Sequence, residues 1–171
     1  MLEFEFKILD FIHNNMSSPF MDKIMKFFTF LGDAGWIWII TAITLLCTKK
    51  YRKTGIMLAL GLVLGLVCAS VILKPLVARL RPFQLRESIN LIINAPRDFS
   101  FPSGHTTASV VCATIIGLTH KKAALWVWTF ASLIAFSRLY LYVHFPTDIL
   151  GGLILGVAVG FSSVKLGKYI I

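Results

Sequence analysis

The segment Ser137–Asp148 lies between two long apolar runs and contains an arginine, a histidine and an aspartate: Arg138, His144 and Asp148. Ionisable side chains at a membrane boundary are energetically costly and usually mark a substrate or ion pathway. Pro146 suits the first turn of a helix, which places His144 just before that helix and Asp148 in its first turn. The carboxylate can then fix the tautomer of the imidazole and make it a nucleophile or a base. The same residues also fit a capped helix start with a loop histidine paired to a carboxylate.

Two further polar clusters adjoin apolar runs, and their members are of the types that hold an anion or move a proton. One cluster contains Lys74 and Arg81, and the other contains Ser103, Gly104 and His105. The planar guanidinium groups of Arg81 and Arg138 suit phosphate oxygens. A helix that begins at Ser103 and Gly104 presents free backbone N–H groups to an anion. With one histidine to attack and the other to donate a proton, this set fits a two-step phosphoryl transfer.

Each of these residues has a simpler explanation when it is taken alone. Lys74 or Arg81 is more often a membrane-interface residue whose charge reaches water. Ser103 is more often a helix N-cap, and His105 is more often a structural hydrogen-bonding residue. All of these explanations would have to hold at once, so we favour one shared site formed where several helix ends meet at one membrane depth.

The composition is that of an integral membrane protein, and the length of the chain is enough for one domain. Of its 171 residues, 57% are hydrophobic and 15% are charged, whereas soluble domains average about half apolar and a quarter charged. The net charge is +9, but the basic residues are scattered between apolar runs, which argues against nucleic acid as a partner. The three cysteines lie within or at the end of apolar runs, so we expect packing residues rather than disulfides.

The apolar runs predict an all-α, polytopic membrane bundle with five spanning helices. The predicted spans cover about residues 34–48, 54–73, 103–119, 123–142 and 146–164. Residues 1–33 mix apolar and charged positions and favour an N-terminal interfacial segment of amphipathic helices, which leaves 34–171 as the transmembrane domain. A sixth span formed from residues 17–33 is the alternative. Asp33 lies in a predicted helix break and is a candidate N-cap.

The charge distribution predicts the orientation in the membrane. Residues 49–53, 120–122 and 165–171 carry basic but no acidic side chains, so the positive-inside rule places them in the cytoplasm and the three polar clusters on the extracytoplasmic side. Glycines recur at a spacing of four in the second and fifth spans, at Gly61, Gly65, Gly152, Gly156 and Gly160. This spacing predicts close helix packing, within one chain or between two, so the oligomeric state stays open.

The three clusters resemble the three-part signature of the type 2 phosphatidic acid phosphatases (PAP2), a family that includes bacterial lipid pyrophosphate phosphatases, glucose-6-phosphatase and the vanadium haloperoxidases. The matching parts are Lys74, six residues and Arg81-Pro82; Pro102-Ser103-Gly104-His105; and Ser137-Arg138, five residues, His144, three residues and Asp148. The resemblance covers nearly the whole chain beyond residue 34.

The resemblance implies a role for each residue. His144 would attack phosphorus and form a phosphohistidine, with Asp148 orienting it, and His105 would protonate the leaving group and later activate water. The phosphoryl oxygens would be held by three cations, a hydroxyl and a backbone amide, from Lys74, Arg81, Arg138, Ser103 and Gly104. The resemblance also implies metal-independent chemistry, and we expect no cofactor.

Within the family, the chain is similar to small bacterial enzymes that dephosphorylate undecaprenyl diphosphate. The segment 83–101 is too short for a separate head-group domain, so the expected partners are membrane lipids and a lipid phosphate held by its phosphate and tail. A phosphatidylglycerophosphate or phosphatidic acid phosphatase is the nearest alternative, and a non-catalytic lipid-phosphate binder or transporter is the alternative of another class. We expect an active site on the extracytoplasmic side of the bacterial plasma (inner) membrane.

Overall fold

The computed structural model describes residues 2–86 and 89–170, and within these ranges it is all-helical, with 83% helix and no strand. The helices are α1 (Leu2–Met16), α2 (Pro19–Gly32), α3 (Trp36–Cys47), α4 (Arg52–Leu66), α5 (Lys74–Val77), α6 (Pro82–Leu85), α7 (Gly104–Thr119), α8 (Lys121–Tyr140) and α9 (Pro146–Ile170). Short 3₁₀ turns join α2 to α3 and α3 to α4, and a π-helical segment, Val67–Leu73, joins α4 to α5. The predicted all-α membrane bundle is therefore confirmed.

Four helical stretches in the described ranges are long and apolar enough to cross a membrane, and α7 is a shorter apolar helix. The four stretches are Pro19–Cys47, Lys49–Leu85, Lys121–Tyr140 and Pro146–Tyr169. The first begins well before residue 34, where the sequence predicted it, because α2 continues into α3 through the turn Asp33–Gly35. In this turn Ala34 and Gly35 both have positive φ angles, 50° and 68°, which bend the chain without ending the helical stretch. The placement of residues 1–33 at the membrane interface stays a prediction.

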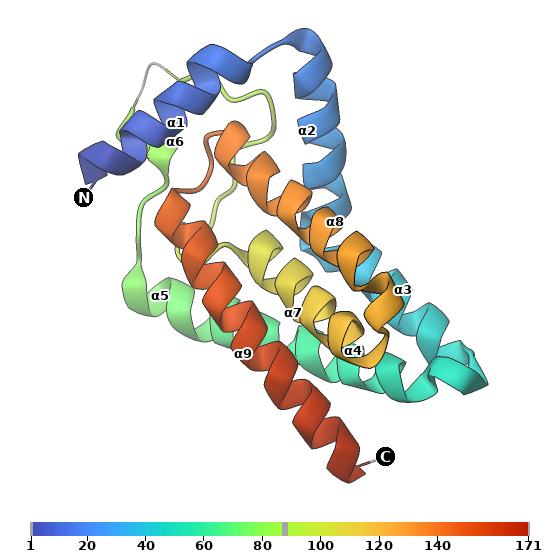
Figure 1. Ribbon diagram of the computed structural model, residues 1–171. Coiled ribbons are helices and arrows are strands. Elements are labelled where there is room, and N and C mark those ends of the chain that lie inside the picture. Colours follow the sequence, from blue (N-terminus) through green and yellow to red (C-terminus); the bar gives the residue numbers. More distant parts are fainter. Residues whose placement is uncertain (1, 87–88, 171) are drawn as a thin grey trace.

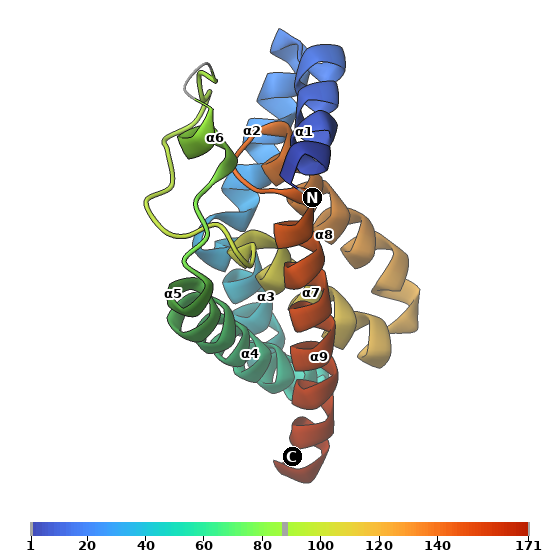
Figure 2. The same ribbon diagram turned by 90° about the vertical axis from the view of Figure 1, so that its left-hand side faces the viewer.

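Helix α7 lies at the centre of the bundle, packed between α8 and α9 and against α4 (Figure 1). Most of its residues from Thr106 to Ile116 are buried, which explains how a helix shorter than a bilayer span sits among longer ones. Figures 1 and 2 both show α1, the segment between α6 and α7, and the turn between α8 and α9 gathered at one end of the bundle. The N-terminal ends of α7 and α9 and the C-terminal end of α8 are thus directed toward the same end.

Glycines let α9 approach α7 closely. A Cβ atom added to Gly156 would lie 2.7 Å from Val110 Cβ and 3.0 Å from Thr107 O, and one added to Gly160 would lie 2.6 Å from Thr114 Cβ. The glycines spaced by four residues in α9 therefore pack helices within one chain, which was one of the two possibilities left open by the sequence.

We expect Gly156→Ala to destabilise the protein, because the new methyl group has no room against α7. Overpacking of this kind typically lowers the free energy of unfolding by about 1–3 kcal/mol. Gly65→Ala is the matched control, since a Cβ at Gly65 meets Val111 Cγ2 at an ordinary 3.4 Å and alanine is the better helix former. Thermal unfolding in detergent would measure both variants. Equal melting temperatures for Gly156→Ala and the parent protein would contradict the packing described here.

Candidate active site

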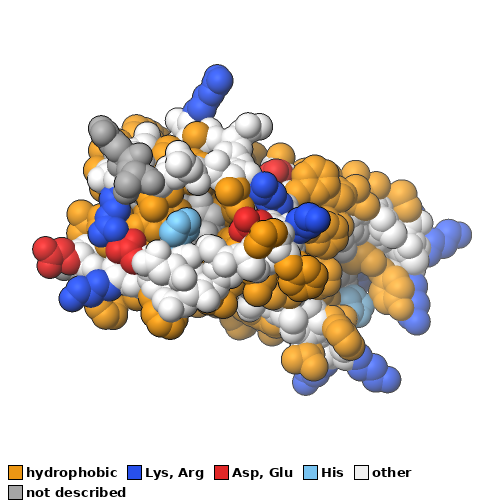
Figure 3. Space-filling model, turned by 90° about the horizontal axis from the view of Figure 1, so that it is seen from above, with side chains coloured by type: hydrophobic (Ala, Val, Ile, Leu, Met, Phe, Trp, Pro, Cys, Tyr) orange, Lys and Arg blue, Asp and Glu red, His pale blue; other side chains and the backbone are white. Residues whose placement is uncertain are grey.

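The fold brings the three polar clusters to one cavity at the end of the bundle. Lys74 lies where the π-helical segment meets α5, Arg81 precedes α6, and His144 lies in the turn between α8 and α9. Six of the eight predicted site residues line this cavity of about 1250 Å³: Lys74, Arg81, Gly104, His105, Arg138 and His144. The other two, Ser103 and Asp148, are fully buried next to it. Figure 3 looks onto this end of the molecule, where charged and histidine side chains of the surface lie among hydrophobic ones, whereas most of the site residues are buried beneath it.

The contacts of His144 fix which of its ring nitrogens faces the cavity. Arg81 Nη1 lies 3.2 Å from His144 Nε2, and a guanidinium can only donate a hydrogen bond. Nε2 is therefore the unprotonated nitrogen, and the proton lies on Nδ1, 3.5 Å from Asp148 Oδ2. Burial, followed by the positive charges of Arg81 and Arg138, holds the pKa of His144 well below its ordinary value. The ring is thus neutral, with a lone pair directed at the cationic side of the cavity.

Asp148 is held by partners that the sequence did not reveal. Its carboxylate accepts hydrogen bonds from Arg79 Nη1 at 2.6 Å, from Ser100 Oγ at 2.5 Å and from the backbone N–H of Phe145 at 2.8 Å. Arg79 also donates to Glu5 Oε2 of α1 at 2.6 Å, and its guanidinium lies 4.1 Å from the centre of the Phe145 ring. A buried carboxylate requires a compensating cation. This rule was the one available signal for Arg79, which lies between Lys74 and Arg81 but is not one of the signature positions.

The cationic side of the cavity is occupied by a carboxylate. Asp98 forms ion pairs with Lys74 Nζ and, at 2.7 Å, with Arg81 Nη2. Arg81 is further fixed by donating from Nη1 to Val143 O at 2.7 Å. Arg138 donates to Thr29 Oγ1, and among the described residues its buried Nε has no hydrogen-bond partner. An incoming anion could therefore bind to these cations.

Ser103 and Gly104 shape the start of α7 in different ways. The hydroxyl of Ser103 caps the helix by accepting from the backbone N–H of Thr106 at 3.4 Å and from Thr106 Oγ1 at 3.0 Å. Its side chain is thus bound to its own helix rather than directed into the cavity. Gly104 lines the cavity, and an added Cβ would meet no atom within 4 Å. The missing side chain leaves open space beside the first turn of α7.

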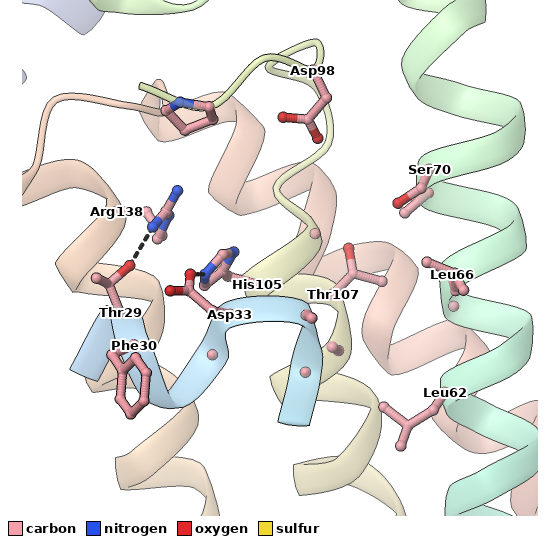
Figure 4. A pocket seen from close by; sticks show the side chains of 18 of the residues that line it. Thr29, Phe30, Asp33, Leu62, Leu66, Ser70, Asp98, His105, Thr107 and Arg138 are labelled. Carbon is pink, nitrogen blue, oxygen red and sulfur yellow. Dashed lines mark hydrogen bonds and ion pairs between the residues drawn. The ribbon is translucent and has the colours of Figure 1, made fainter. Parts of the chain in front are cut away.

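His105, on the first turn of α7, contacts the turn between α2 and α3. Its Nε2 lies 2.9 Å from Asp33 Oδ1, as Figure 4 shows. Asp33 is not the N-cap that the sequence suggested, because Gly35 precedes the first residue of α3 and the Asp33 carboxylate reaches His105 instead. No group of three or more His, Cys, Asp or Glu side chains in the described ranges is placed to hold a metal ion.

Away from its charged end, the cavity is apolar. It continues between α3 and α4, where it is lined by aliphatic side chains that include Ile39, Ile43, Leu62 and Leu66. Figure 4 shows Leu62 and Leu66 on the α4 side, across the cavity from Arg138, Asp33 and His105. A cavity with a cationic end and an apolar continuation matches a molecule that carries a phosphate on a hydrocarbon tail.

We expect Asp98→Asn to lower KM for a phosphate-bearing substrate and to strengthen inhibition by free phosphate. Partial burial by itself would raise the pKa of Asp98, but the ion pairs with Lys74 and Arg81 outweigh it and lower the pKa to about 2. The carboxylate is therefore charged near neutral pH and competes with phosphate for both cations. Because the pKa of Asp98 is lower in the folded protein than its ordinary value, these ion pairs stabilise the fold above about pH 4, the ordinary aspartate value. This contribution is lost as the pH falls through about 2. Steady-state kinetics with added phosphate would test the competition, and an unchanged inhibition constant would contradict it.

Comparison with known proteins agrees with this architecture. Residues 53–171 match the model of the PAP2 superfamily. An undecaprenyl-diphosphatase of Sulfolobus acidocaldarius is 34% identical over 150 residues, covering 85% of this chain and 70% of the relative. A lipid A 4'-phosphatase of Porphyromonas gingivalis is 31% identical over 169 residues, covering 91% and 70%.

Similarity to a solved structure extends over the whole fold. The crystal structure of a transmembrane PAP2-type phosphatidylglycerolphosphate phosphatase from Bacillus subtilis superimposes with a TM-score of 0.81, at 24% identity, over 99% of this chain and 87% of that one. At this identity the likeness bears on the fold alone, whereas the family match spans most of the sequence. The chain therefore belongs to the PAP2 superfamily and is a membrane-embedded phosphatase.

Proposed function

We propose that the protein hydrolyses a lipid phosphate or diphosphate at the extracytoplasmic face of the bacterial plasma membrane, with undecaprenyl diphosphate as its preferred substrate. The observation that carries the mechanism is the orientation of His144, whose unprotonated Nε2 lies 3.2 Å from Arg81 Nη1 in the cavity. A neutral nitrogen beside a phosphate-binding cation is a nucleophile already in position.

In the first step, His144 Nε2 attacks phosphorus, a P–N bond forms, and the bond from phosphorus to the leaving oxygen breaks. His105 gives a proton to that oxygen. Asp148, beside Nδ1–H, stabilises the positive charge that develops on the ring of His144. Lys74, Arg81 and Arg138 meet the charge on the equatorial oxygens, together with the amide of Gly104 at the start of α7.

In the second step, water attacks the phosphohistidine and the P–N bond breaks. His105, now neutral, takes a proton from the water, which restores both histidines. Ser103 contributes by capping α7 and so fixing the helix end that faces the phosphate. None of these steps requires a metal ion.

The preference for a polyprenyl diphosphate rests on the relative named undecaprenyl-diphosphatase, which is the most similar of those described above. A second candidate, a lipid A phosphatase, is favoured by the relative that aligns over 91% of this chain. A phosphatase for a glycerol-based lipid, phosphatidylglycerophosphate or phosphatidic acid, is a further candidate, and a phosphatidylglycerophosphatase of Bacillus subtilis that is 31% identical over 155 residues supports the first of these two lipids. The extracytoplasmic placement is supported by the basic residues at the opposite end of the bundle, among them Lys49, Lys50 and Lys121.

The test is phosphate release by the purified protein in detergent with EDTA. Undecaprenyl diphosphate, phosphatidylglycerophosphate, phosphatidic acid and lipid A would be compared at equal mole fraction in the micelles. We expect undecaprenyl diphosphate to give the highest kcat/KM and EDTA to have no effect. A higher value with another lipid would replace the substrate but keep the mechanism, and the absence of release from all four would leave a non-catalytic lipid-phosphate binder as the remaining function.

A further inference from the structure

The turn between α2 and α3 contacts the ring of His105, and the residues of this turn lie outside the three signature motifs. On one side of the ring, Gly32 approaches so closely that an added Cβ would lie 2.6 Å from His105 Cδ2 and 3.4 Å from Cγ. At the adjacent ring atom, Nε2 lies 2.9 Å from Asp33 Oδ1. The positive φ angles of Ala34 and Gly35 return the chain into α3 directly after this contact. A turn with this shape fixes both the position and the rotation of the imidazole.

The same contacts determine which ring nitrogen is available to a substrate. In an imidazole ring, the bond from Nδ1 to Cε1 lies opposite Cδ2, so the edge that contains Nδ1 faces away from Gly32. His105 lines the cavity, and 17% of its side chain is exposed. No hydrogen bond from any residue in the described ranges reaches Nδ1, whereas Nε2 is bound by Asp33. Nδ1 is therefore the nitrogen left for proton transfer.

The charge of Asp33 suits this arrangement. Arg138, Lys74 and Arg81 line the same cavity and oppose a further positive charge on His105. A carboxylate at Nε2 favours the protonated ring and keeps the Nε2 proton in place when the ring is neutral. The side chain of Asp33 is 57% exposed, so its charge stays hydrated and needs no second cation.

We infer that Asp33 is a positioning residue for His105, and that His105 transfers its proton through Nδ1. The two histidines then form mirrored carboxylate pairs: Asp148 holds Nδ1 of His144 and leaves Nε2 to attack, while Asp33 holds Nε2 of His105 and leaves Nδ1 to act as acid and base. This inference rests on the proposed phosphohistidine mechanism, within which it names the acting atom and its support.

The proton balance follows the two steps. When the bond from phosphorus to the leaving oxygen breaks, that oxygen receives the Nδ1 proton, and His105 becomes neutral with Nε2–H still bound to Asp33. When water attacks the phosphohistidine, Nδ1 takes a water proton, and the imidazolium beside Asp33 is restored. Asp33 itself neither gains nor loses a proton.

The test uses leaving groups that differ in their need for a proton. Phosphatidylglycerophosphate releases an alcohol and needs a general acid, whereas p-nitrophenyl phosphate releases a stable phenolate and does not. The value of kcat/KM reports the steps up to departure of the leaving group. We expect Asp33→Asn to lower kcat/KM about 10- to 100-fold with the lipid, on the scale of other residues that support a ligand or catalytic group, and to leave it unchanged with p-nitrophenyl phosphate. Equal losses with both substrates, or no loss with either, would overturn the inference.

Three further variants separate this role from a structural one. Asp33→Glu keeps the carboxylate and should recover part of the lost lipid activity, which also guards against a folding defect in Asp33→Asn. Adding Asp33→Asn to His105→Ala should cause no further loss, because Asp33 acts through His105, and independent losses would contradict this. Asp22→Asn, on α2 just before this turn, removes a carboxylate that binds Tyr140 instead, and it should not discriminate between the substrates. If the parent protein releases phosphate from neither of these substrates nor from undecaprenyl diphosphate, the proposed function fails rather than the role of Asp33.

Discussion

Replacement of His144 by alanine should abolish phosphate release and phosphoenzyme formation while the protein stays folded. The ring is almost fully buried, and its Nε2 is the nucleophile in the proposed mechanism. Loss of a group that acts as part of a catalytic unit lowers kcat by roughly 10⁴- to 10⁶-fold in other hydrolases. Phosphate release and acid-labile labelling from a radioactive lipid phosphate would measure both effects.

His120→Ala is the control for the His144 variant. His120 lies between α7 and α8, where its Nε2 is 2.9 Å from Thr54 Oγ1, and it does not line the cavity. This variant should therefore retain turnover and labelling. Retention of turnover by His144→Ala would show that another group attacks phosphorus and would reject the mechanism.

Replacement of Asp148 by asparagine should lower kcat by about 10⁴-fold, the loss seen when an aspartate that orients a catalytic histidine is changed to its amide. The amide cannot stabilise a positive charge on His144, and it can donate a proton toward Nδ1 and so favour the wrong tautomer. It would also leave Arg79 Nη1 without the carboxylate that lies 2.6 Å away, although Glu5 would still bind Nη2. Phosphate release gives kcat, and the melting temperature gives the structural part of the effect.

The matched control for Asp148→Asn is Asp10→Asn on α1. Asp10 forms an ion pair with Arg86 and accepts from Tyr142, and it lies outside the cavity lining. We expect this variant to keep most of its activity. If both variants lost activity and stability equally, Asp148 would be supporting the fold rather than His144.

The sequence predicted the membrane helices and the meeting of the three clusters because both depend on regular signals. Apolar runs predict where helices span, and the charge distribution predicts that Lys74, His105 and His144 lie at the same end of the helices, where the structure has them lining one cavity. Pro146 and the spacing of four residues placed Asp148 beside His144, and the structure has this arrangement at 3.5 Å. Local spacing was enough for these features.

The supporting residues were not predictable in the same way, because their partners are far away in the chain. Asp33 reaches His105, and Asp98 reaches Lys74 and Arg81, by contacts that no periodicity encodes. Distant partners also account for part of the polarity of α2, whose charged and polar residues suggested an interfacial helix. Asp22 of α2 accepts a hydrogen bond from Tyr140, and Thr29 accepts one from Arg138, so part of this polarity is directed at α8.

The contact from Glu5 through Arg79 to Asp148 has a practical consequence for anyone who produces this protein. Glu5 is near the start of the chain, yet only one guanidinium separates it from the carboxylate that supports the nucleophile. An affinity tag or fusion partner that displaced α1 would therefore lower the activity, and this loss could be mistaken for a defect in a catalytic residue. The C-terminus lies at the opposite end of the bundle (Figure 1), and it is the safer site for a tag.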